Sequence, residues 1–242
     1  MNTYRGNAVA AGILLLIATV AAIVGRALFA PYVSDPVDLA SVSSHTMPIF
    51  AGAFLQLVGY AACPAIAIAL YPVLRRYSEA LALGSVVFRV IEGTFYSMGV
   101  VGLLLLVSLS QEAVQPGVTD SSQVQHSAAM LVAARDWLGS VAGVAFFACG
   151  GLLYYWVLFQ SVIVPRWLSG WGLVAAAMSL GGALLVLFQA VVPMSTGHIV
   201  LNLPIAVQEM VLAVWLIAKG FDERVAVSVP APAGSIAGAH AG

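Results

Sequence analysis

The segment SVVFRVIEGTF, residues 85–95, places an arginine and a glutamate three positions apart inside a long apolar run. On a helix Arg89 and Glu92 lie on the same face, where a guanidinium and a carboxylate can pair. A third charge, Glu209, stands in the last apolar run, NLPIAVQEMVLAVWLIAKGF. Ionisable residues within membrane-spanning segments are candidates for ligand, ion or proton sites. These three residues are therefore the first candidates for a functional site.

Arg89 and Glu209 are expected at the same depth. Each lies ten residues from a charged residue at the edge of its apolar run, Glu79 and Lys219 respectively, or ~15 Å at ~1.5 Å per residue. An unpaired charge near the membrane midplane costs at least ~2.5 to 3.5 kcal/mol. We therefore expect Arg89 to contact Glu209, with Glu92 as a second or competing partner, and the two helices to pack together. Two carboxylates against one guanidinium leave a spare negative charge, so one glutamate is expected to bind a proton.

Helical spacing extends the candidate site toward the outer side. Tyr96 follows Glu92 on the same face, His198 and Asn202 precede Glu209 in its run, and Gln56 lies among small residues in the second run. All four residues lie in the outer half of a predicted helix. The inner halves of these helices are apolar and should pack together without water. The resulting prediction is an outward-opening cavity above a charged floor, for a small polar or amphipathic ligand. The predicted ligand-binding residues are Arg89, Glu92, Tyr96, Glu209, Asn202, Gln56 and His198.

Two alternatives stay open at this point. Small and polar residues at helical spacing also serve close packing and hydrogen bonds between membrane helices, so the cluster could be purely structural. Arg89 and Glu92 could likewise pair only along their own helix. Pro204 favours a functional cavity, because it frees a backbone carbonyl and should bend the helix near Glu209.

Composition and segment length indicate an all-α membrane protein. Of the 242 residues, 62% are hydrophobic and 8% charged, against roughly 25% charged in soluble domains. Lipid cannot satisfy exposed backbone groups, so apolar runs of ~20 residues must be helices. Six such runs predict a polytopic bundle of six transmembrane helices, at residues 8–30, 49–71, 80–109, 128–164, 167–192 and 199–218. The net charge of −1 argues against nucleic acid as a partner.

The basic residues predict orientation. Arg5, the Arg75–Arg76 pair, Arg166 and Lys219 alternate with loops that carry neither Lys nor Arg. By the positive-inside rule both termini are cytoplasmic, in the inner membrane of a bacterium. Arg26 and Arg135, toward the outer ends of their helices, are expected to extend to the interface. The domain is expected to cover residues 1–221, and residues 222–242 to form a disordered cytoplasmic tail.

Three segments together resemble a family. FRVIEG, VPRWLSGWGL and the ending LPIAVQEMVLAVWLIAKGF are similar to the bacterial membrane proteins grouped as domain of unknown function (DUF) 4386, from about Tyr4 to Phe221. The most specific elements are Pro204, Glu209 and the WL and KGF sequences of the ending, and Arg89 and Glu92 match as well. The resemblance implies a membrane fold and a role for these positions, but no reaction.

The sequence leaves three function classes. A ligand-binding or transport-like bundle suits the mid-depth charges and is the favoured interpretation. An intramembrane enzyme would depend on three histidines on the outer side, His45, His126 and His198, which could bind Zn²⁺ if they converged. Their spacing matches no metal motif, so no metal or other cofactor is predicted. The third class is a structural or signalling partner of another membrane protein.

Overall fold

The computed structural model describes residues 4–33, 36–115 and 121–222, and within these ranges the regular secondary structure is entirely helical. The all-α prediction is confirmed. The elements are α1 (Arg5–Phe29), α2 (Leu39–Ser44), α3 (Thr46–Leu74), α4 (Glu79–Ala113), α5 (Ser121–Trp137), η1 (Leu138–Gly143), α6 (Val144–Ser161), α7 (Arg166–Leu187) and α8 (Thr196–Ala218).

Six helical segments are long and apolar enough to cross a membrane, which confirms the predicted number of spans within the described ranges. Five of them are α1, α3, α4, α7 and α8. The other is the 40-residue run Ser122–Ser161, formed by α5, η1 and α6 in succession. The π-helical turn η1 and the short helix α2 were not predicted, because neither changes the apolar pattern that marks a span.

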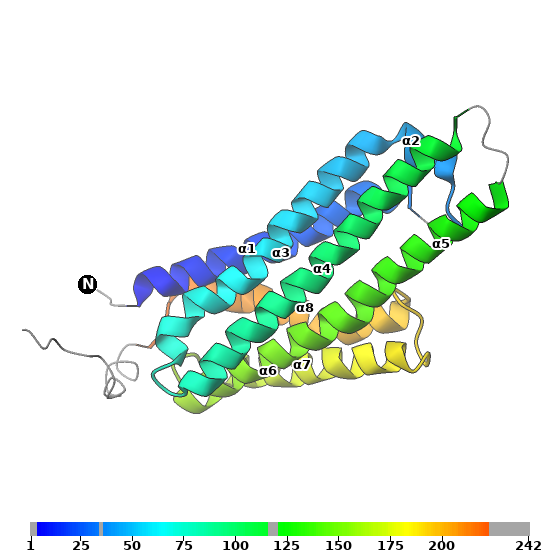
Figure 1. The fold of residues 1–242 in the computed structure, drawn as a ribbon. Helices are drawn as coiled ribbons and strands as arrows, with labels where there is room; N and C mark the ends of the chain where they lie inside the picture. The colour runs from blue at the N-terminus through cyan, green and yellow to red at the C-terminus, as the bar shows by residue number, and fades with distance from the viewer. Residues whose placement is uncertain (1–3, 34–35, 116–120, 223–242) are drawn as a thin grey trace, which may run out of the picture.

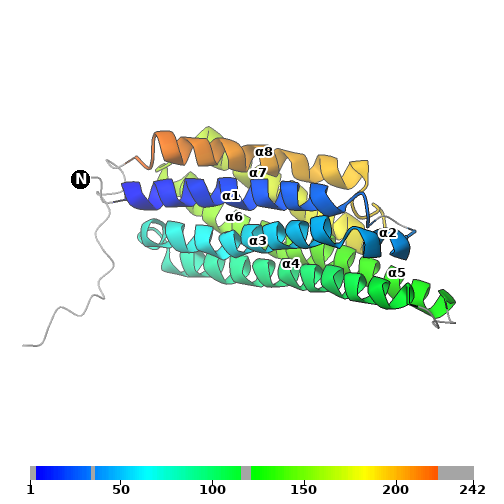
Figure 2. The ribbon, with the colours of Figure 1, turned by 90° about the horizontal axis from the view of Figure 1, so that it is seen from above.

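The six spans form a ring. Going round it, α1 packs against α3, α3 against α4, α4 against α6, α6 against α7, α7 against α8, and α8 against α1. Figure 2 shows α8, α1, α3 and α4 succeeding one another across the molecule. The helices that carry Arg89 and Glu209, α4 and α8, are therefore opposite each other. The expectation that these two helices pack together is wrong, because α1 and α3 separate them on one side and α6 and α7 on the other.

Glycines set the closest approach in the ring, between α1 and α3. A Cβ atom on Gly52 would lie 2.5 Å from the carbonyl oxygen of Gly25, and one on Gly59 would lie 3.0 Å from that of Ala18. Small residues let membrane helices pack backbone against backbone. The stripe of small residues in the second apolar run therefore holds α1 in place.

The buried apolar core has two parts. One cluster joins all six spans near the end of the bundle that holds the chain ends, with Leu15, Leu70, Leu158 and Leu212 among its members. The other joins α1, α2, α3, α4 and α5 near the far end, around Phe29 and Leu103, and contains no residue of α7 or α8. The half of the bundle near the chain ends is thus packed with apolar side chains, as predicted for the inner half.

Both described chain ends lie at one end of the bundle, as an even number of spans requires (Figure 1). The Arg5 guanidinium donates to the carbonyl oxygens of Leu216 and Ile217, at 3.4 and 2.5 Å, and so caps the end of α8. We call this end proximal and the opposite end distal. The predicted disordered tail, except for its first residue Asp222, lies outside the described residues.

Which membrane face holds the proximal end stays a prediction, and labelling can test it. We expect a cysteine at Ser122, on the distal end, to react with an impermeant maleimide in intact cells. A cysteine at Arg75, on the proximal end, should react only after lysis. Both positions are exposed, so a difference in labelling reports sidedness. The reverse pattern would contradict the positive-inside assignment.

Candidate functional site

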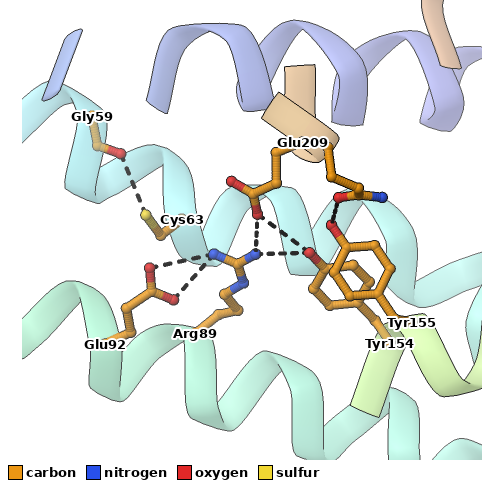
Figure 3. A network of polar contacts seen from close by, with 8 residues as sticks. Gly59, Cys63, Arg89, Glu92, Tyr154, Tyr155 and Glu209 are labelled. Carbon is orange, nitrogen blue, oxygen red and sulfur yellow. Dashed lines mark hydrogen bonds and ion pairs between the residues drawn. The ribbon is translucent and has the colours of Figure 1, made fainter. Parts of the chain in front are cut away.

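Arg89 is the centre of a buried polar network (Figure 3). Its side chain is 2% exposed. One terminal nitrogen, Nη1, donates to both carboxylate oxygens of Glu92, at 3.3 and 3.2 Å. The other, Nη2, donates to Glu209 Oε1 at 3.0 Å. The predicted pairing of Arg89 with Glu209 and Glu92 is confirmed, and the long arginine side chain spans the interior between α4 and α8.

Tyr154 of α6 completes this network. Its hydroxyl accepts from Arg89 Nη2 at 3.1 Å and donates to Glu209 Oε1 at 3.3 Å. The Arg89 guanidinium also lies over the rings of Phe147 and Tyr154, 4.8 and 5.4 Å from their centroids. Cation–π contact with aromatic faces stabilises a desolvated guanidinium. Sequence reasoning missed Tyr154, because a tyrosine in GLLYYW has the same appearance as an aromatic residue at the membrane interface.

A second hydrogen-bonded chain holds the neighbour of Glu209. Gln208, fully buried, accepts from the Tyr155 hydroxyl and donates to the carbonyl oxygen of Leu168 at 3.0 Å. These bonds connect α8 to α6 and α7. The hydrogen bonds of Gln208 therefore fix the rotation of α8 about its own axis. Because Glu209 is the next residue, its carboxylate is directed toward the interior of the ring.

A cavity of about 450 Å³ lies on this network. It is lined by residues of α1, α3, α4, the α5–η1–α6 span and α8, and by Met194 just before α8. All seven residues predicted to bind a ligand are in its wall: Gln56, Arg89, Glu92, Tyr96, His198, Asn202 and Glu209. Whether they bind a ligand stays a prediction. Gln189, two residues beyond the end of α7, was also expected in the outer half of a helix from the sequence, but it is exposed and does not line this cavity.

The polar side chains on the distal side of the Arg89 network differ in their hydrogen-bond partners. Asn202 donates to the carbonyl oxygen of His198 at 2.9 Å, within its own helix. Nδ1 of His198 accepts from the Met194 amide at 3.3 Å, while its Nε2 is buried and has no partner among the described residues. Gln56 is 4% exposed and lines the cavity, and among the described residues no hydrogen bond joins its side-chain amide to another residue. Buried polar groups without protein partners require water or a ligand.

The π-helical turn η1, which packs against α4 and α7, shapes one wall of the cavity. It begins one residue after Trp137 and carries Gly139 and Ser140, both in the cavity wall. A Cβ on Gly143, its last residue, would collide with the ring of Tyr96, which stacks on Tyr60 at 4.9 Å between centroids. Single π-helical turns are frequent at functional sites. Here the turn makes room for an aromatic pair beside the cavity.

Two arginines line the distal part of the cavity, Arg26 of α1 and Arg135 of α5. They were expected to extend to the membrane interface. The Arg135 side chain is 13% exposed, and its Nη1 lies 3.9 Å from Oδ1 of Asp136. Its guanidinium carbon lies over the ring of Phe29, 4.6 Å from the ring centroid. The distal part of the cavity is thus positively charged, and its proximal floor carries one guanidinium and two carboxylates.

The three histidines do not form a metal site. Within the described ranges, no group of three or more His, Cys, Asp or Glu side chains is placed to hold a metal ion. His45 is exposed and stacks on Tyr32 at 4.2 Å, His126 is exposed, and only His198 lines the cavity. The three histidines considered from the sequence therefore do not converge.

Comparison with known families agrees with the resemblance seen in the sequence. Residues 10–220 match the model of a family described as domain of unknown function (DUF4386). The chain belongs to this family. No curated protein and no solved structure matches it. In this DUF4386 protein the matched range contains every residue of the Arg89 network and the whole cavity wall.

Proposed function

We propose that this DUF4386 protein binds a small polar or amphipathic ligand inside the membrane, in the cavity above Arg89. The observation that carries the proposal is the cavity itself. Protein interiors leave few voids larger than a water molecule, whereas ligand pockets measure roughly 300 to 1,000 Å³. A cavity of about 450 Å³ falls in that range, and a charge cluster that served packing alone would not need it.

The chemistry of the wall supports the same conclusion. Ligand sites combine apolar walls with a few convergent polar groups. Here Phe147, Tyr60 and Ile66 supply apolar surface, while the amide of Gln56 and the carboxylate of Glu209 supply polar groups. Both polar residues are buried. They need partners that the described protein does not provide in full.

The cavity is closed toward the proximal end. The Arg89 network forms its floor, and the apolar cluster around Leu70 and Leu212 fills the bundle beyond it. In this conformation a ligand can be held but has no path through the bundle. Transport would require the network to open, so binding is the primary proposal and transport depends on a second conformation.

Filling the cavity tests the proposal. Ala206 lines it, whereas the next residue, Val207, is 44% exposed and does not. We expect the purified protein in lipid nanodiscs to gain thermal stability from members of a panel of small amphiphiles. A ligand at 100 times its Kd adds about 2.7 kcal/mol. Ala206→Trp should abolish these gains, and the matched Val207→Trp should keep them. Equal responses of both variants, or no response of the wild type, would refute a ligand site in this cavity.

A further inference from the structure

We propose that the ligand is an amphiphile with a protonated amine, whose ammonium group binds the carboxylate of Glu209 and which enters from the bilayer between α1 and α8. This inference rests on the proposed function and adds the ligand's charge, its binding atom and its route. Three observations carry it: the charge balance of the floor, one unpaired carboxylate oxygen, and the packing of α1 and α8 on different neighbours.

The floor has room for one more positive charge. Glu92 and Glu209 face a single guanidinium, that of Arg89, so the three groups together carry one excess negative charge when both carboxylates are ionised. Both terminal nitrogens of Arg89 are already engaged. Among the described residues only the Nε of this guanidinium has no partner, and that nitrogen is buried. An anionic ligand group would therefore find no free donor at the ends of the guanidinium and would meet two carboxylates. A cationic group would neutralise the excess charge.

Glu209 offers the binding atom. Both oxygens of Glu92 accept from Arg89, and its side chain is 2% exposed. Glu209 uses only Oε1, which accepts from Arg89 and Tyr154. Its side chain is 11% exposed, and Oε2 has no partner among the described residues (Figure 3). Charge-assisted hydrogen bonds to a carboxylate are roughly twice as strong as neutral ones, so Oε2 is the natural acceptor for an ammonium N–H.

The surfaces next to Glu209 suit a hydrocarbon group. Phe147 and Ile66 lie in the cavity wall with the stacked rings of Tyr60 and Tyr96. Burying apolar ligand surface against such walls gains about 25 cal/mol per Å² only for surface that leaves water. In a bilayer the same surface is already out of water, so the polar head decides whether the ligand prefers the cavity to the lipid.

The packing of α1 and α8 supports an entry between their distal halves. Near the proximal end the two helices touch, where Gly12 lies against Ala213. Toward the distal end each of the two helices packs against a different neighbour. Gly25 of α1 contacts Gly52 of α3, and Leu201 of α8 contacts Gly182 of α7. At the level of the cavity, α1 therefore packs against α3, and α8 packs against α7.

Apolar residues border this entry. Ile23 of α1 and Ile199 and Leu203 of α8 line the cavity, and they are 62, 50 and 54% exposed. Exposed apolar side chains within a membrane-spanning segment face lipid, so this entry leads to the bilayer. Arg26 and Arg135 at the distal end would repel a cation that approached from water. The bilayer is the route that avoids them.

Three probes of equal chain length test the ligand class: decylammonium, decanol and decanoate. Binding is measured calorimetrically to the full chain in phosphatidylcholine nanodiscs, with empty nanodiscs subtracted. We expect decylammonium to bind about tenfold or more tighter than decanol, the ratio that one charge-assisted contact supplies, and decanoate to bind weakest. Ala206→Trp should abolish binding of all three.

Glu209→Gln should remove the preference for decylammonium while decanol binding persists. The matched control is Glu112→Gln, at an exposed position in the last turn of α4, which should behave as the wild type. Decanoate binding as tight as decylammonium, blocked by Ala206→Trp, would overturn the amine assignment and leave the proposed function standing. No binding of any probe to the wild type would overturn the amine assignment, and the amphiphile panel then decides the proposed function separately.

Two measurements do not depend on the folding of Glu209→Gln. The wild-type order of the three probes is decisive by itself. Leu203→Trp narrows the entry between α1 and α8 and should slow association of decylammonium, whereas Val207→Trp, which faces lipid without lining the cavity, should not. Equal association rates for these two variants would refute the route between α1 and α8.

Discussion

Replacing Arg89 by alanine should lower the free energy of unfolding by about 3 to 5 kcal/mol, the usual loss when one partner of a buried ion pair is removed. The change strands Glu92 and Glu209, which are 2 and 8% exposed, without their cationic partner. It also removes the donor to Tyr154 and the contact with Phe147. The loss can be measured by reversible denaturation of the purified protein in mixed micelles. Arg75→Ala, at an exposed arginine of the α3–α4 turn, is the control and should change stability little.

A double-mutant cycle separates pairing from other losses. The variant that combines Arg89→Ala with Glu209→Gln should be more stable than Arg89→Ala alone, because it no longer contains the stranded carboxylate of Glu209. Interaction energies between residues in one network are about 0.5 to 3 kcal/mol. Strictly additive losses would contradict the coupling that the 3.0 Å contact between Arg89 and Glu209 implies.

Gly52→Ala should be the second largest effect on stability, with a loss of about 1 to 3 kcal/mol. The new methyl group would lie 2.5 Å from the carbonyl oxygen of Gly25 and 3.0 Å from the ring of Phe29. Backbone cannot move aside as a flexible side chain can, so α1 must shift away from α3. The shift should also widen the distal cavity, whose wall contains Arg26 and Gln56 from these two helices.

The matched control for this substitution is Gly181→Ala in α7. A Cβ on Gly181 would meet nothing within 4 Å, and alanine is favoured over glycine in a helix by up to about 1 kcal/mol. We expect Gly181→Ala to be neutral or slightly stabilising under the same denaturation conditions. A Gly52→Ala variant as stable as Gly181→Ala would show that the α1–α3 contact has room that the structure does not indicate.

Several features followed from the sequence because a membrane leaves few options. Apolar runs long enough to span lipid must be helices, since no other single-segment structure satisfies its own backbone hydrogen bonds there. The six apolar runs were therefore predicted to be six spans, and the described residues contain six such helical segments. The cost of an unpaired charge in lipid predicted that Arg89 would contact Glu209. Helical spacing placed Tyr96 and Asn202 with that pair, and both line the same cavity.

Only the tertiary structure decided how the spans are ordered around the ring. Helical periodicity identifies a face that avoids lipid, but it does not name the neighbour against which that face packs. For this reason α4 and α8 were expected in contact, although they stand opposite each other and only the length of Arg89 joins them. Tyr154 joined the network because α6 is next to α4 in the ring, a fact that no spacing in GLLYYW reveals. The cavity has the same origin: it exists where α1 leans on α3 and α8 on α7, and such packing between distant segments has no signature in either segment alone.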